Sequence, residues 1–171
     1  MHSLRNLILA PLLLVIHLVL LIEVNAQTKQ DSIDYPEAIY PITSLGVTLL
    51  KPIGFQVADN FTGFIHATAG TTIEVREQPN ANYVFSSAAF TEERLDAQGM
   101  TLLKKEEVTL DSGKKGLLYK VSFTVEEIPH ERYMLFTGTY NTMYICSGTY
   151  SKSIAHLIGD VVKNSLLTLT F

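Results

Sequence analysis

The sequence predicts an α+β domain in which a twisted antiparallel sheet is packed between helices. Two periodicities carry this prediction. Apolar residues recur at every second position from 117 to 125, as they do in a strand with one buried face. Residues 79–98 and 151–166 instead carry apolar residues at the spacing of a helix. Strands that follow one another, with helices before and after them, indicate an antiparallel meander covered by helices.

The first half of the domain is predicted to begin with a strand and a hairpin. Residues 46–50 form a short apolar run that Pro52 ends, because proline lacks the backbone N–H that a sheet uses. Residues 64–67 and 72–75 flank Gly70. Glycine readily takes the positive φ of a tight turn, so these two segments are expected to pair as a hairpin.

A helical region is predicted next, over residues 79–98. Thr91 precedes two glutamates and has the side chain of a good helix cap. Gly99 is placed to end the helix. The apolar residues at helical spacing are Val84, Phe85, Ala88, Ala89 and Leu95.

The remaining strands follow in a meander. Residues 108–110 lead through the polar turn 111–114 into the strand 117–125. Residues 133–138 and 143–150 are apolar on both faces, which predicts central strands covered above and below. The residues expected on one face of the first long strand are Leu117, Tyr119, Val121, Phe123 and Val125.

The chain closes with a predicted amphipathic helix over residues 151–166, lying on the sheet. Lys152, Asp160 and Lys163 are expected to face solvent. The residues expected to face the sheet are Ile154, Leu157, Ile158, Val161 and Val162.

The order of these elements, together with the segments 51–55, 97–100 and 163–167, resembles the PsbP-like superfamily. The likeness covers residues 46–171, and the DcrB-like exported bacterial proteins are the nearest relatives it suggests. It implies a PsbP-like α/β/α sandwich. It also implies a non-catalytic role in partner binding, assembly or envelope maintenance, because most members of the superfamily act in these ways. The segments consist of structural glycines, prolines and core positions, so the likeness carries over no binding residue.

The amino terminus predicts export. Arg5 precedes an almost unbroken apolar run over residues 7–22, and residues 24–26 fit the small-residue pattern that signal peptidase cleaves. We expect a signal peptide over residues 1–26 and a new amino terminus at Gln27, in a secreted or periplasmic protein. The run is shorter than the roughly twenty residues that span a bilayer. An uncleaved membrane anchor is the alternative. Residues 27–45 read as an extended lead-in, and residues 46–171 as one domain.

Composition narrows the classes of partner. The formal net charge is −4 at pH 7. This mild acidity argues against nucleic acid and against an anionic membrane surface, both of which require clustered lysine and arginine. Cys146 is the only cysteine, so no disulfide is expected within the exported chain. The partner that the resemblance and the predicted export imply is a protein or another envelope component.

No catalytic, cofactor-binding or metal-binding residue is assigned from the sequence. His66, His130 and His156 do not have the spacing of a zinc site. Cys146 lies in an apolar strand, where cysteine behaves as a small hydrophobic residue. A secreted hydrolase, with a site assembled only by folding, is the alternative function. A deep cleft in which His66 or His130 meets a carboxylate or Cys146 would favour it.

Two polar motifs have an ordinary structural reading beside a functional one. Glu126, Glu127 and Glu131 provide carboxylates of the kind that bind divalent cations, but they lack the calcium-loop spacing and are typical of a solvated turn. Residues 60–62 fit an acceptor for N-glycosylation at Asn60, which matters only in a eukaryotic source.

Overall fold

The computed structural model describes residues 37–171; the predicted signal peptide lies outside them. The large sheet contains seven strands, in the order β3-β4-β5-β9-β8-β7-β6, and all neighbours are antiparallel. The predicted antiparallel sheet is confirmed. Its strands are β3 (Gln56–Val57), β4 (Gly63–His66), β5 (Thr71–Pro79), β6 (Thr101–Thr109), β7 (Lys115–Val125), β8 (Ile128–Gly138) and β9 (Thr142–Ser151).

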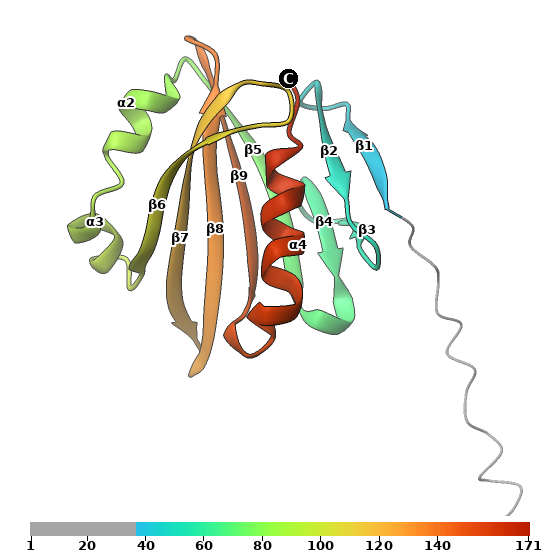
Figure 1. Ribbon diagram of the computed structural model, residues 1–171, viewed down its shortest axis with the longest axis vertical. Coiled ribbons are helices and arrows are strands. Elements are labelled where there is room, and N and C mark those ends of the chain that lie inside the picture. Colours follow the sequence, from blue (N-terminus) through green and yellow to red (C-terminus); the bar gives the residue numbers. More distant parts are fainter. Residues whose placement is uncertain (1–36) are drawn as a thin grey trace, which may run out of the picture. The chain divides into compact units, whose positions relative to one another are not determined.

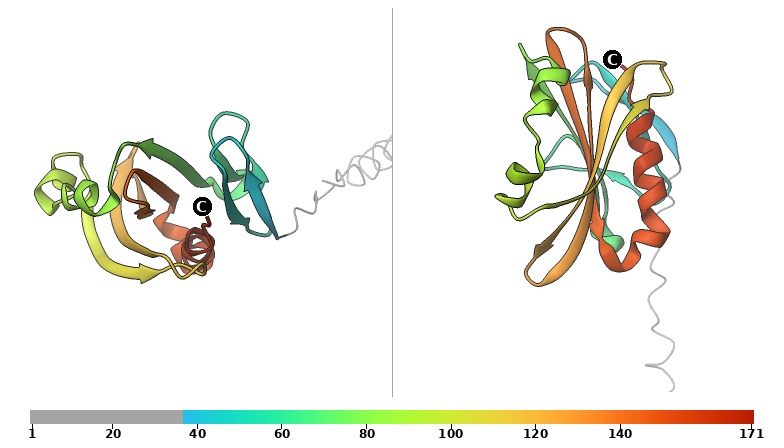
Figure 2. Two further views of the ribbon diagram at one scale, coloured as in Figure 1. Left: turned by 90° about the horizontal axis from the view of Figure 1, so that it is seen from above. Right: turned by 60° about the vertical axis from the view of Figure 1, so that its left-hand side comes forward.

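Helices cover both faces of this sheet. The long helix α4 (Ala155–Leu167) packs on β8 and β9 from one side. The short helices α2 (Tyr83–Ala88) and α3 (Glu92–Asp96) lie on the other side, where α2 contacts β8 and β9, and α3 contacts β6. Figures 1 and 2 show the sheet between these two helical layers. The predicted α/β/α arrangement is confirmed, and short 3-10 helices precede β5 (η1, Ala67–Ala69) and α4 (η2, Lys152–Ile154).

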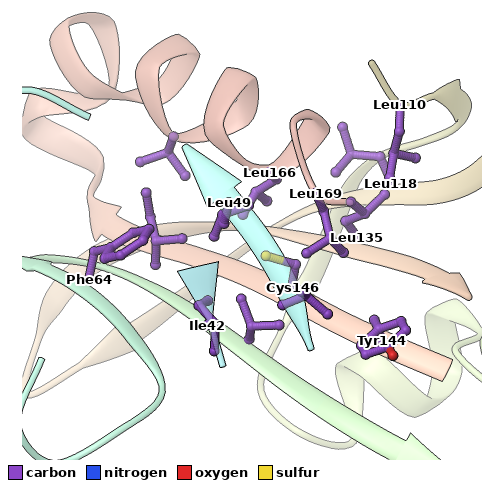
Figure 3. Close-up of a cluster of buried hydrophobic side chains, with 14 of the residues drawn as sticks. Ile42, Leu49, Phe64, Leu110, Leu118, Leu135, Tyr144, Cys146, Leu166 and Leu169 are labelled. Carbon is purple, nitrogen blue, oxygen red and sulfur yellow. The ribbon is translucent and has the colours of Figure 1, made fainter. Parts of the chain in front are cut away.

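The sheet separates two hydrophobic cores. Successive side chains of a strand point to opposite faces, so neighbouring residues such as Leu118 and Tyr119 enter different cores. The larger core lies on the α4 side, and Figure 3 shows part of it. The smaller core lies beneath α2 and α3, and its buried members are Leu95, Tyr119, Val121, Met134, Phe136 and Met143.

The folded domain begins earlier than the sequence predicts. Strand β1 (Ala38–Ile42) falls within the expected lead-in, yet it pairs antiparallel with β2 (Val47–Lys51) in a small second sheet. Pro41 does not prevent this pairing, because β1 is an edge strand and its outer N–H groups need no partner strand. Within the described residues, the lead-in is an extended strand from Ala38 to Ile42 and is part of the fold.

The helical region 79–98 consists of two short helices rather than one long one. Thr91 caps α3 as predicted, since its hydroxyl accepts a hydrogen bond from the backbone N–H of Arg94. Gly99 follows with φ of 72°. Val84 and Phe85, two of the apolar residues at helical spacing, are 51% and 76% exposed. The chain turns between the helices, and Phe90 fills the smaller core in their place.

Helix α4 turns a different face to the sheet from the one predicted. Leu157 is 67% exposed and Val161 38% exposed, so both expectations of burial are wrong. A Cβ on Gly159 would lie 3.2 Å from the hydroxyl of Tyr150. The helix therefore approaches the sheet through small residues, which a search for large apolar side chains overlooks. The buried residues of α4 are Gly159, Val162, Ser165 and Leu166.

Candidate functional site

The histidines are not brought together. His66 lies on the α4 side of the sheet, where its Nδ1 accepts a hydrogen bond from the backbone N–H of Ala69 at 3.3 Å and so caps η1. His130 lies on the opposite side, stacks on the ring of Phe123, and has Nδ1 2.9 Å from the carbonyl oxygen of Ile128. His156 is exposed on α4. Each of these three imidazoles therefore has a separate environment.

Cys146 is sealed inside the larger core. Its exposed fraction is 0%, and Figure 3 shows its side chain among the leucines of this core. Burial raises the pKa of the thiol well above its usual range, and the charge of Glu74 raises this pKa further. A thiolate is the nucleophilic form of cysteine, so this environment suppresses its reactivity. The position agrees with the reading of Cys146 as a small hydrophobic residue.

The raised pKa of Cys146 predicts a loss of stability at alkaline pH. The unfolded chain loses the thiol proton above about pH 8.5, whereas the folded chain retains it, so the free energy of unfolding falls as pH rises. At about pH 9.5 this one group is expected to lower it by about 1.4 kcal/mol relative to neutral pH. Urea unfolding across this pH range measures the effect. The Cys146→Ala variant is the control, and the same pH dependence in both proteins would contradict the assignment.

The acidic residues do not form a cation site. Glu126 and Glu127 make the β7–β8 turn with φ of 47° and 65°, and both are exposed. Glu131 is buried on the α4 side, 2.7 Å from Nζ of Lys120, and accepts a hydrogen bond from the hydroxyl of Tyr150 at 3.4 Å. Within residues 37–171, no three His, Cys, Asp or Glu side chains are grouped to hold a metal ion.

Asn60 lies in the loop between β3 and β4, and its side chain is exposed. An exposed loop position is what N-glycosylation requires. Modification of Asn60 stays a prediction.

A polar surface occupies the part of the sheet that α2 and α3 leave uncovered. Along β8, the side chains on this side change from Met134 to Arg132, and along β9 they change from Ile145 to Ser147. Along β8 and β9, apolar residues on this side continue only as far as the two helices cover them. We call the uncovered part the open face; its residues are Thr72, Glu74, Arg76, Phe123, His130, Arg132, Ser147 and Thr149.

Arg132 occupies the open face in a half-buried position. Its Nε donates a hydrogen bond to the hydroxyl of Thr149 at 2.8 Å, and the guanidinium carbon lies 4.8 Å from the centre of the Phe123 ring. Burial lowers the pKa of Arg132; the charge of Glu74 acts in the opposite direction, and that of Arg76 adds to the lowering. Thr149 and Phe123 thus hold the guanidinium in place.

The carboxylates nearest to Arg132 already have partners. Glu74 lies 2.7 Å from Nε of Arg76. Glu131 immediately precedes Arg132 in β8, so its side chain points to the other side of the sheet, toward Lys120. None of the four ion pairs among residues 37–171 involves Arg132. They join Arg76 to Glu74, Lys120 to Glu131, and both Lys104 and Lys163 to Glu106. The terminal amino groups of Arg132 therefore have no carboxylate within this part of the chain.

A hollow lies beside the free edge at the end of β7. Strand β6 begins at Thr101, which pairs with Ser122, whereas β7 continues to Val125. The last three residues of β7 therefore have no neighbouring strand of the described chain on that side. The hollow beside them has a volume of about 320 Å³ and is lined by Gly99, Thr101, Ser122, Phe123, Thr124, Pro129 and Lys152.

The fold has a counterpart among solved structures. The cyanobacterial PsbP protein CyanoP from Synechocystis sp. PCC 6803 superimposes with a TM-score of 0.57 over 78% of this chain and 91% of its own, at 12% sequence identity. The fold is PsbP-like. The fold implied by the sequence resemblance is therefore confirmed.

A second protein shares the PsbP-like fold. The protein of unknown function PA94 from Pseudomonas aeruginosa has a TM-score of 0.51 and 13% identity, over 79% of this chain and 96% of that one. No protein family and no curated protein matches the sequence itself. At these identities the structural likeness establishes the fold alone, so the narrower resemblance to DcrB-like proteins stays a prediction.

The sequence analysis did not single out the open face of this PsbP-like domain. A signal was present, because β8 changes from the polar residues His130, Glu131 and Arg132 to apolar residues, and Thr149 pairs with Arg132 on the next strand. Alternation alone assigns such residues to a face of the sheet without showing whether a helix covers that face.

Within the described part of the PsbP-like domain, no helix has the length and apolar character needed to cross a bilayer.

Proposed function

We propose that this protein is an exported, non-catalytic domain that binds a partner through the open face of its sheet. The open face carries the proposal, because it is the part of the central sheet that neither helical layer covers and its side chains are polar except for Phe123. The predicted signal peptide, which lies outside the described residues, supports export. The PsbP-like fold is compatible with a non-catalytic role.

The positions of the reactive side chains support binding over hydrolysis. A hydrolase of the kind considered above needs His66 or His130 beside a carboxylate or Cys146. His66 and His130 lie on opposite sides of the sheet, and Cys146 is fully buried between the sheet and α4. Each histidine Nδ1 is also engaged with the backbone close to it in sequence.

A bulky substitution on the open face tests this proposal. Ser147 lies on the open face, and Ser147→Tyr is expected to abolish chemical crosslinking to a partner in envelope extract of the source organism, because the added ring occupies the binding surface. Asn164→Tyr is the matched control, since Asn164 is exposed on the opposite layer, in α4. The Asn164→Tyr, His66→Ala and His130→Ala variants should keep the crosslinked product when folded.

The same variants also show which results would contradict the proposed binding function. If Ser147→Tyr retains the crosslinked product, the open face is not the binding surface. If a folded histidine variant loses a measurable hydrolytic turnover while Ser147→Tyr keeps it, the hydrolase alternative replaces the proposal. Circular dichroism of each variant shows whether the variant is folded.

A further inference from the structure

Arg132 is the one residue of the open face whose charge is partly removed from water without an ion-pair partner in the described chain. Removing a charge from water is costly unless an opposite charge or hydrogen bonds compensate for it. Thr149 satisfies only Nε, and stacking on Phe123 gives a modest cation–π attraction. The terminal amino groups form the planar fork that matches a carboxylate.

We propose that the open face binds an extended peptide segment whose carboxylate side chain pairs with Arg132. The inference rests on the proposed function and names the chemistry of the partner. The carboxylate would accept hydrogen bonds from the terminal amino groups of Arg132, while Thr149 and Phe123 hold the guanidinium in the required orientation.

The charges of the open face favour a single carboxylate over a phosphate. Arg132 and Arg76 contribute two positive charges, and Glu74 contributes one negative charge. The surface thus has an excess of one positive charge. A monoanion neutralises this excess, whereas a dianion would leave the surface with a net negative charge.

The unpaired end of β7 favours an extended peptide over a small acid. A strand edge presents backbone N–H and C=O groups to which a further strand can add. The hollow beside residues 123–125 leaves space for that strand. Phe123 is the lining residue that also contacts Arg132, so alternate side chains of a strand added at this edge would face the guanidinium.

The experiment uses the purified protein and two pools of acetylated, amidated pentapeptides with randomised flanks. One pool has glutamate at the centre and the other glutamine. Nuclear magnetic resonance follows the Nε–Hε signal of Arg132 during each titration. We expect saturable shifts with the glutamate pool, at an affinity about tenfold higher than with the glutamine pool, because a charge-assisted pair replaces a neutral hydrogen bond.

Arginine variants test whether Arg132 causes the difference in affinity between the two peptide pools. Arg132→Gln should remove the discrimination between the pools, measured on backbone signals of residues 123–125. Arg132→Lys keeps the charge without the planar fork and should retain only part of the discrimination. Arg94 is exposed on α3, away from the open face, and Arg94→Gln should leave the discrimination unchanged.

Other outcomes overturn the inference. Equal affinity for the two pools, or no binding of either, excludes carboxylate recognition at Arg132. Inorganic phosphate is titrated in parallel; saturation of the Arg132 signal by phosphate without a response to the glutamate pool assigns the site to a phosphate instead. If Ser147→Tyr abolishes partner crosslinking while the pools are not distinguished, the proposed function stands and this inference fails.

Discussion

Leu166→Ala is expected to lower the free energy of unfolding by about 2–5 kcal/mol, whereas Leu157→Ala on the same helix should change it by less than about 0.5 kcal/mol. Leu166 is fully buried in the larger core, so its truncation leaves a cavity that the neighbouring strands fill only partly. Leu157 is 67% exposed. Urea unfolding followed by circular dichroism measures both values.

The two leucines form a matched pair, since the chemical change and the helix are the same. Helix propensity therefore changes equally in both variants, and the difference between them reports burial. Equal losses, or a larger loss for Leu157→Ala, would show that α4 turns its other face to the sheet.

Gly148→Ala should destabilise the protein by about 1–3 kcal/mol, although it adds only a methyl group. Gly148 lies on β9 beneath α4, and a Cβ there would lie 2.1 Å from Cγ1 of Val162. Val162 is fully buried, so its side chain cannot turn into solvent. Either α4 or the strand must move, which loosens the packing around it. Chemical denaturation of Gly148→Ala measures the loss.

A double-mutant cycle tests whether this contact causes the loss. Val162→Ala alone removes buried methyl groups and should cost roughly 2 kcal/mol or more. In the double variant, the new methyl group at position 148 occupies space that Val162 has vacated, so the combined loss should be smaller than the sum of the single losses. Additive losses would place the strain elsewhere.

Strand patterns in the sequence predict the sheet well because burial repeats with a period of two. Residues 117–125 carry one apolar face, and Tyr119 and Val121 are fully buried in the smaller core. The hairpin at Gly70 is also confirmed, with φ of 57°, since the turn depends on a local property of glycine. Both predictions need only neighbouring residues.

The sequence predicts less well which face of a helix packs against the sheet. The sequence shows that Leu157 and Val162 share a helix, but close approach through Gly148 and Gly159 decides which of them is buried. Gly148 lies against Val162 and Gly159 against Tyr150, so each contact joins α4 to β9 and is a property of the tertiary structure. For the same reason, the open face could not be predicted from the sequence. The sequence does not show that Arg132 is uncovered, because this depends on where α2 and α3 lie in the folded protein.

The ion pair between Lys120 and Glu131 also has a consequence for strand alignment. The two residues lie on adjacent strands, β7 and β8, and both face α4. Sliding β8 by one residue would turn Glu131 to the open-face side of the sheet, while Lys120 stays on the α4 side. Lys120 would then lose its carboxylate partner, which leaves a partly desolvated charge unpaired. The pair therefore disfavours a one-residue slip of a strand whose buried Met134, Leu135 and Phe136 are apolar on both faces.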